Sequence, residues 1–209
     1  MSTLDRAAVI EKFSVSRETI ARVDAYVGAL EKWTPRINLV AKSTLPDLWT
    51  RHVADSLQVA ELLQEQDLRY CDFGSGGGLP GLIVAAVLAE KQPQTEIILV
   101  ESDQRKAAFL MSAAREMGVT ARVMASRIES LPKIGANVIS ARALAPLPKL
   151  LEWASPHLAP GGRCLFLKGA AFRQEIDEAL VNWRFDSEKW TSATNPDAVV
   201  LELRNIAHV

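Results

Sequence analysis

A chain of 209 residues is long enough for one well-buried domain with an extension, and short for two domains. Hydrophobic residues make up 48% and charged residues 23%, an ordinary globular balance, and no apolar run approaches the roughly 18–20 residues of a membrane span. The opening stretch MSTLDRAAVIEKF carries acidic side chains and has no apolar centre, so we expect no secretion signal and no membrane partner. We expect a soluble, cytoplasmic protein in which Cys71 and Cys164 are buried, reduced thiols.

Helices are predicted for the first 65 residues. In residues 18–33 apolar side chains recur at three- and four-residue steps, and Pro35 ends this helix. Its inward stripe consists of Ile20, Val23, Val27, Leu30 and Trp33. A second helix is expected over residues 46–63. Its inward residues are Leu48, Val53, Leu57 and Ala60.

From residue 69 onward, short apolar strands alternate with helices. The predicted strands are 69–73, 96–102, 121–126, 137–142, 162–169 and 199–205, and the predicted helices are 79–90, 104–118 and 147–158. Strands that are apolar on both faces and alternate with helices indicate an α/β fold, a mostly parallel, doubly wound, Rossmann-like sheet. We expect residues 66–209 to form this domain and residues 1–65 to be a helical N-terminal extension, packed against it as one compact unit or covering it as a lid.

Residues 71–81 read CDFGSGGGLPG, a glycine-rich loop between the first strand and a helix. Ligands of open α/β sheets bind at the carboxyl ends of strands, and a glycine loop lets them approach bare backbone under a helix N-terminus. Two cofactors fit such a loop. Gly76, Gly78 and Gly81 satisfy the dinucleotide pattern G-x-G-x-x-G, which would suit a nicotinamide oxidoreductase. Asp72 with Gly74, Gly76 and Gly78 also resembles the first motif of S-adenosylmethionine-dependent methyltransferases, which we favour.

The second strand ends in Glu101 and Ser102. A carboxylate at this place can accept hydrogen bonds from both ribose hydroxyls of a nucleoside cofactor, as either candidate requires. Glu101 follows Gly74 by 27 positions, somewhat longer than the roughly 20 of the dinucleotide pattern. This spacing favours the methyl donor.

Several further strings occur in a fixed order along the chain. They are NLV at 38–40, RHVADSL at 51–57, DFGSGGGLPG at 72–81, LVESDQRKAAFL at 99–110, SRIESLP at 126–132, RALAPLPKLL at 142–151 and LFLKG at 165–169. Together they resemble the RsmG (GidB) family of bacterial 16S rRNA guanine-N7 methyltransferases. The resemblance implies a class I methyltransferase that modifies the N7 of a guanine in the 530 loop of small-subunit rRNA.

The resemblance also assigns roles to residues. Gly74 and Leu79 would border S-adenosylmethionine, Glu101 would hold its ribose, and Ile128 and Glu129 would flank its adenine. Arg142 would lie at the donor's amino-acid end or at the RNA entrance and would position the substrate. The family often has Ser-Arg-Ala after the fourth strand, whereas this chain has Ser-Ala-Arg-Ala at 140–143.

The chemistry of N7 agrees with this assignment. The guanine N7 lone pair is free, so methyl transfer needs positioning and electrostatics rather than a side-chain acid or base. The chain has no Asn/Asp-Pro-Pro-Tyr/Phe after the fourth strand, and neither cysteine follows a proline, which argues against amino-group and cytosine-C5 methylation. No His/Cys/Asp cluster has metal-ligand spacing, so we expect no metal.

The partner expected from these features is 16S rRNA or the small ribosomal subunit, bound by a monomer. The candidate RNA contacts are Arg51, His52, Arg127, Lys168 and Arg173. Residues 122–173 carry eight basic and two acidic side chains, which indicates a phosphate-facing surface or a solvated face whose counter-charges arrive on folding. Trp33, Trp49 and Trp153 are expected in the core rather than as stacking platforms. A small-molecule methyltransferase and a non-catalytic ribosome-binding protein remain alternatives.

Overall fold

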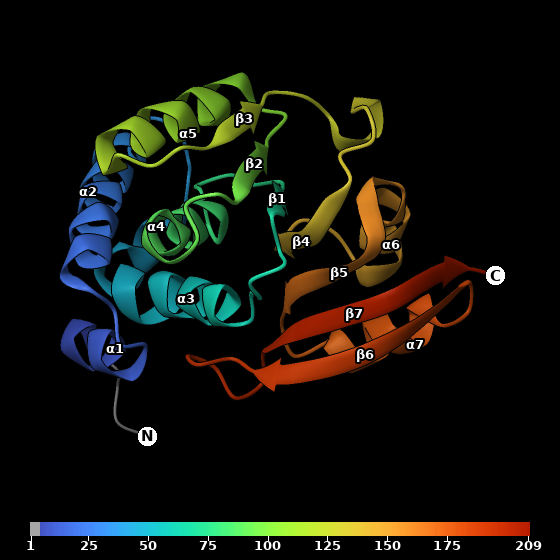
Figure 1. The fold of residues 1–209 in the computed structure, drawn as a ribbon. Coiled ribbons are helices and arrows are strands. Elements are labelled where there is room, and N and C mark those ends of the chain that lie inside the picture. The colour runs from blue at the N-terminus through green and yellow to red at the C-terminus, as the bar shows by residue number, and fades with distance from the viewer. Residues whose placement is uncertain (1–4) are drawn as a thin grey trace.

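The computed structural model describes residues 5–209, which form a sheet covered by helices on both faces (Figure 1). The α-helices are α1 (Arg6–Lys12), α2 (Arg17–Trp33), α3 (Ala54–Glu61), α4 (Gly81–Lys91), α5 (Gln104–Met117), α6 (Leu147–Ala154) and α7 (Phe172–Ala179). The strands are β1 (Arg69–Phe73), β2 (Glu96–Val100), β3 (Arg122–Met124), β4 (Ala136–Arg142), β5 (Leu158–Lys168), β6 (Trp183–Thr191) and β7 (Val199–His208). None of the helices in this described part is both long and apolar enough to cross a membrane.

The sheet has the strand order β3-β2-β1-β4-β5-β7-β6. The first five strands in this order pair in parallel, and β7 runs antiparallel to both β5 and β6. The predicted doubly wound, mostly parallel sheet is therefore confirmed. The order reverses beside β1, so the loops that follow β1, β2, β4 and β5 meet at one edge, where ligands of such sheets bind.

Side chains of the central strands alternate between two apolar clusters. Tyr70 and Leu99 pack with α2, α3, α4 and α5, whereas Cys71, Ile98 and Ile139 pack with α6 and α7. Figure 1 shows these two groups of helices on opposite sides of the sheet. This alternation explains why the strands are continuously apolar in sequence, and it buries both free cysteines as predicted.

The N-terminal helices pack against the sheet domain and do not stand apart from it. Val23, Tyr26 and Leu30 of α2 are fully buried in the same cluster as Leu82 and Ile83 of α4. These contacts agree with a packed extension, and the division of the chain at residue 65 stays a prediction. A cut at residue 65 would divide this continuous core.

Residues 46–61 are helical, but they do not form the single regular helix that the apolar pattern predicts for residues 46–63. A 3₁₀ helix, η1 (Lys42–Asp47), contains Pro46 and leads into a π-helical turn, η2 (Leu48–Val53), before α3 begins. The four predicted inward residues are all buried: Leu48, Val53, Leu57 and Ala60. The π turn carries Arg51 and His52, and π turns often occur at functional sites.

Gly81 provides a test of how closely α4 packs on the sheet. A Cβ at this position would lie 2.8 Å from Asp72 Oδ2 and would overlap Leu99 Cδ2, both in the buried interior. We expect Gly81→Ala to lower the free energy of unfolding by about 2–3 kcal/mol, because the core is overpacked. Urea denaturation measures this change in the free energy of unfolding. Gly28→Ala on α2 is the control: no atom lies within 4 Å of the added Cβ, so a gain of about 0.5–1 kcal/mol is expected.

Candidate functional site

The glycine loop joins β1 to α4 and has a backbone that other residues would adopt at a cost. Gly74, Gly76 and Gly78 have φ angles of +63°, +53° and +87°, in the left-handed region that favours glycine. The Ser75 N–H donates to the Val100 carbonyl at 3.0 Å, which ties the loop to the end of β2. The loop therefore presents bare backbone at the carboxyl edge of the sheet.

Glu101 follows β2 and holds this loop. Its Oε2 accepts a hydrogen bond from the Gly76 N–H at 2.8 Å, and its Oε1 accepts one from the Asp103 N–H at 2.8 Å. The side chain is nearly buried, yet it lines a pocket. Each carboxylate oxygen keeps a second lone pair, so both can still accept hydrogen bonds from two adjacent hydroxyls of a ligand.

The pocket beside the loop, here called the loop pocket, has a volume of about 260 Å³. Seven of the predicted site residues line it: Gly74, Gly76, Glu101, Ser102, Arg127, Ile128 and Glu129. The wall is completed by residues that were not predicted to line it: Val100, Lys106, Ser126, Ala143, Leu144 and Trp153. The pocket has exposed glycine backbone at one end and the Glu101 carboxylate beside it, which could bind the ribose of a ligand. These features fit a nucleoside such as S-adenosylmethionine.

Three other predicted cofactor residues lie behind the loop pocket. Gly78 and Leu79 are buried, and Asp72 is fully buried under the loop. Tyr70 donates to the Ser140 hydroxyl at 2.5 Å, and Ser140 donates to Asp72 Oδ1 at 2.6 Å. Burial raises the pKa of Asp72 to about 6, although the hydrogen bond from Ser140 lowers it. Asp72 is thus bound to Ser140 in the interior, and its place in the cofactor motif stays a prediction.

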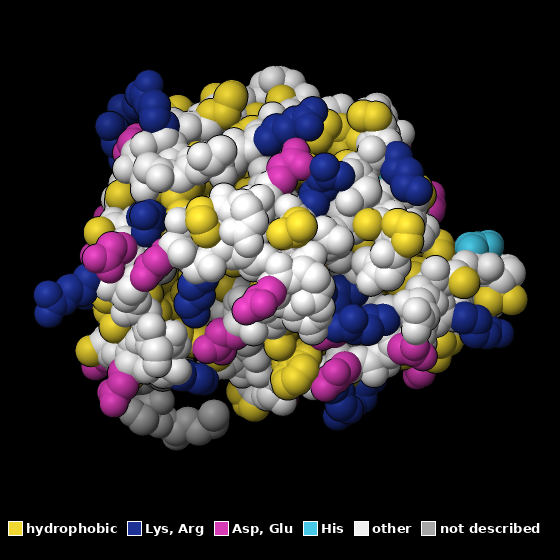
Figure 2. Space-filling view, in the orientation of Figure 1, with side chains coloured by type: hydrophobic (Ala, Val, Ile, Leu, Met, Phe, Trp, Pro, Cys, Tyr) yellow, Lys and Arg dark blue, Asp and Glu magenta, His cyan; other side chains and the backbone are white. Residues whose placement is uncertain are grey.

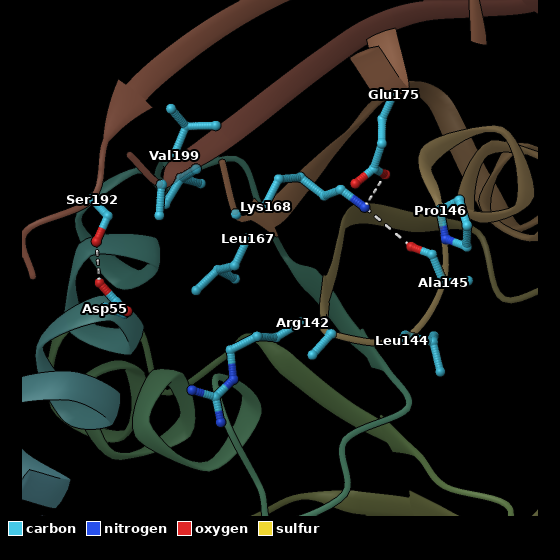
Figure 3. Close-up of a pocket in the computed structure, with 14 residues that line it drawn as sticks. Asp55, Arg142, Leu144, Ala145, Pro146, Leu167, Lys168, Glu175, Ser192 and Val199 are labelled. Atoms are coloured by element: carbon cyan, nitrogen blue, oxygen red, sulfur yellow. Dashed lines mark hydrogen bonds and ion pairs between the residues drawn. The ribbon is translucent and has the colours of Figure 1, made fainter. Parts of the chain in front are cut away.

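A second cavity of about 490 Å³, the β4–β5 pocket, lies between the ends of β4 and β5, the start of β7 and α3 (Figure 3). It shares Ala143 and Leu144 with the loop pocket. Ala143 has a φ of +51°, an uncommon conformation for a residue with a Cβ, and such strain is concentrated at functional sites. The two pockets are therefore separated by one short, strained wall.

Arg142 lines the β4–β5 pocket and does not line the loop pocket. Its Nη1 donates to His52 Nδ1 at 2.7 Å, and His52 Nε2 lies 3.0 Å from the Thr44 hydroxyl. Because Nδ1 accepts, Nε2 carries the proton and donates to Thr44, which donates to the Ala41 carbonyl at 2.8 Å. Burial and the nearby Arg142 charge lower the pKa of His52 to about 4. His52 is neutral and holds Arg142.

Lys168 also lines the β4–β5 pocket, but its charge is already neutralised. Its Nζ lies 2.5 Å from a Glu175 carboxylate oxygen and donates to the Ala145 carbonyl at 3.1 Å (Figure 3). Half of the basic residues in the 122–173 block form ion pairs. The paired residues are Arg122, Lys149, Arg163 and Lys168. Counter-charges therefore do arrive on folding for these four.

The remaining predicted RNA contacts are exposed arginines on separate elements: Arg51, Arg127 and Arg173. Figure 2 shows basic and acidic side chains interspersed over the face it displays rather than gathered into one basic patch. Of the predicted core tryptophans, Trp49 is buried and Trp33 packs edge-on against Phe109, whereas Trp153 is half-buried and lines the loop pocket.

Tyr26 of α2 braces the glycine loop, a contact that the sequence pattern did not predict. Its buried hydroxyl donates to the Gly77 carbonyl at 2.6 Å. We expect Tyr26→Phe to lower the free energy of unfolding by about 1–3 kcal/mol, because the buried carbonyl loses its partner, and to weaken nucleoside binding at the loop. Denaturation and calorimetry with S-adenosylhomocysteine measure these two effects. A variant within about 0.5 kcal/mol of wild type with unchanged affinity would contradict it.

Known proteins are similar to this chain in fold and in sequence. TYW2 from M. jannaschii, solved in complex with AdoMet, superposes with a TM-score of 0.57 at 11% identity, covering 78% of each chain. The Ribosomal RNA small subunit methyltransferase G of Ruegeria pomeroyi is 50% identical over 94% of this chain and 96% of its own. That of Cereibacter sphaeroides is 48% identical over 97% and 98%. The GidB family, described as rRNA small subunit methyltransferase G, matches residues 19–200.

The superposition shows a Rossmann-like fold, and together with the family match it defines this protein as an S-adenosylmethionine-dependent methyltransferase. Within this class, the family match over residues 19–200 and the relatives that align over nearly their whole length identify one family. The chain belongs to the GidB family of rRNA small subunit methyltransferases, which confirms the resemblance found in the sequence.

Proposed function

We propose that this enzyme, acting as a monomer, transfers a methyl group from S-adenosylmethionine to N7 of a guanine in the 530 loop of 16S rRNA. The observation that carries the proposal is the pair of adjoining cavities, which share the wall of Ala143 and Leu144 at the carboxyl edge of one chain's sheet. The loop pocket would hold the donor and the β4–β5 pocket the target base.

Different residues of the loop pocket bind different parts of the donor. Glu101 accepts hydrogen bonds from the ribose hydroxyls, and Gly74 and Gly76 let the backbone approach the amino-acid end. Ile128 and Glu129 flank the adenine, and Ser102 lines the same pocket. When bound, S-adenosylmethionine supplies an electrophilic methyl group on a positively charged sulfur.

The β4–β5 pocket needs no general base for this reaction, because the N7 lone pair carries no proton. Methyl transfer would form the N7–carbon bond as the sulfur–carbon bond breaks, and it would move the positive charge from sulfur to the purine ring. The remaining task is to fix the base in line with the methyl group. Arg142, held by His52, positions the nucleotide through its remaining guanidinium donors.

The target guanine must be unpaired or splayed out of a helix. In A-form RNA, N7 lies in a major groove too deep and narrow for side chains. The exposed Arg51, Arg127 and Arg173 are suited to neighbouring phosphates, so RNA binding should weaken steeply as salt rises. The predicted RNA contact of Lys168 would have to compete with its ion pair to Glu175.

The direct test incubates the purified protein with tritiated S-adenosylmethionine and either naked 16S rRNA or 30S particles, both from cells that lack the modification. The expected product is 7-methylguanine, recognised by aniline cleavage of the labelled strand after borohydride reduction and mapped to one nucleotide. Failure to label either substrate would refute the proposal. A label that resides on another atom or base would refute the assignment to N7.

A further inference from the structure

Asp55 is an acidic side chain whose position in the β4–β5 pocket has no counterpart among the predicted site residues. It lies on α3, one turn after Arg51 and His52, and lines the pocket with Arg142 and Ser192 (Figure 3). The other charged residues of the pocket lining are Arg142, Lys168 and Glu175, and Glu175 is bound to Lys168. Asp55 is therefore its one acidic group without a cationic partner among the described residues.

Half of the Asp55 carboxylate is fixed and half is free. Oδ1 accepts hydrogen bonds from the Ser192 hydroxyl at 2.7 Å and the Thr194 hydroxyl at 3.0 Å. None of the residues 5–209 hydrogen-bonds Oδ2. Two hydroxyls thus orient the group and leave one oxygen, together with the spare lone pair of the other, available for donors from a ligand.

We propose that Asp55 selects guanine by accepting hydrogen bonds from its N1–H and its 2-amino group. The inference rests on the proposed function and names the specificity-determining residue of its base site. Guanine alone among the four RNA bases presents two adjacent donors of this kind on its Watson–Crick edge. A carboxylate meets such a pair with two acceptors, and charge-assisted hydrogen bonds of this type are about twice as strong as neutral ones.

The same contact would orient N7 for reaction. In guanine the N1 and 2-amino edge lies on the side of the purine away from N7. Figure 3 shows Asp55 and Ser192 on one side of the pocket and Leu144, Ala145 and Pro146 on the other. Leu144 belongs to the wall shared with the loop pocket. A guanine held at Asp55 would therefore turn N7 toward that wall and toward the donor.

The contact is also stronger in the transition state than in the ground state. As N7 takes the methyl group, the purine becomes positively charged and N1–H becomes a better hydrogen-bond donor. An ionised carboxylate at N1–H then stabilises the developing charge. The pKa of Asp55 lies above its ordinary value, because burial raises it more than the hydroxyls of Ser192 and Thr194 and the charges of Arg142 and Arg51 lower it.

The experiment compares two RNA hairpins that differ only at the mapped target, which is guanosine in one and inosine in the other. Inosine keeps N1–H and N7 but lacks the 2-amino group. We measure single-turnover methyl transfer, and separately the binding of each hairpin in the absence of any donor. Wild-type protein should prefer guanosine at least tenfold, which corresponds to about 1.4 kcal/mol. Asp55→Asn and Asp55→Ala should bring that ratio to within twofold of one, and Ser192→Ala should reduce it partially.

The ratio separates recognition from a structural role. If Asp55 only holds the loop of Ser192 and Thr194, its variants will slow both hairpins equally and keep the tenfold ratio, which overturns the inference. Equal use of the two hairpins by wild-type protein also overturns it. Asp197→Asn, the same charge change on an exposed residue of the neighbouring loop, should leave the ratio at the wild-type value. Absence of guanine methylation by the wild type in both naked 16S rRNA and 30S particles would instead refute the proposed function itself.

Discussion

Replacing Glu101 with alanine should weaken the binding of S-adenosylhomocysteine at least 100-fold, about 2.8 kcal/mol, in calorimetry. The expected loss is large because one carboxylate carries two duties. It would hold the ribose hydroxyls, and it already accepts the N–H groups of Gly76 and Asp103 at 2.8 Å each. Removing it leaves two backbone donors at a nearly buried site without their partner and loosens the loop that borders the ligand.

Glu65→Ala is the matched control for this measurement. Glu65 is exposed and does not line the loop pocket, so its removal should change the affinity less than threefold. Glu101→Gln should fall between the two, because the amide keeps one acceptor and places an NH₂ group against a backbone N–H. An Glu101→Ala variant that stays folded and binds the nucleoside like wild type would exclude the loop pocket as the donor site.

Replacing Arg142 with alanine should slow single-turnover methyl transfer to rRNA at least 100-fold while changing S-adenosylhomocysteine affinity less than threefold. The two readouts separate because Arg142 lines the β4–β5 pocket and not the loop pocket. Misplacing a reacting group by a small distance is enough for a loss of this size. Arg142→Lys keeps the charge but not the planar donor set, so we expect a loss of about tenfold.

His52→Ala tests whether the histidine acts through Arg142. The variant should slow methyl transfer, and adding it to Arg142→Ala should cause little further loss, because the two side chains share one hydrogen bond. Additive effects would instead indicate that His52 contacts RNA independently. Equal loss of donor affinity and methyl transfer in Arg142→Ala would contradict its assignment to the base site.

The central sheet was predictable because buried parallel strands leave a continuous apolar signal. Two C-terminal elements carry no such signal and were missed. In β6, the residues WRFDSEKWT form an exposed edge on which only Trp183 is buried. The short α7 buries only Phe172 and Ala179. The irregular helical turns before α3 were missed for another reason, since an apolar stripe reports the buried face and not the hydrogen-bond pattern.

Site residues on one loop or strand end were predictable, and those defined by a distant partner were not. Glu101 and the glycines follow from local spacing, whereas the Lys168 ion pair depends on Glu175 of the unpredicted α7. His52 and Arg142 are 90 positions apart in sequence, so no local pattern joins them. Asp55 could have been found from the sequence, because it lies four residues after Arg51 and three after His52, on the same side of a helical segment.

The hydrogen bond from Tyr26 to the Gly77 carbonyl has a consequence for how the protein can be divided. The nucleoside-binding half is shaped in part by a side chain encoded more than forty positions upstream of the loop. A protein made of residues 66–209 alone would contain the glycine loop but not the Tyr26 hydroxyl that binds it. We propose that any minimal version of this enzyme must begin before α2, and that its catalytic unit is the whole chain rather than its Rossmann-like part.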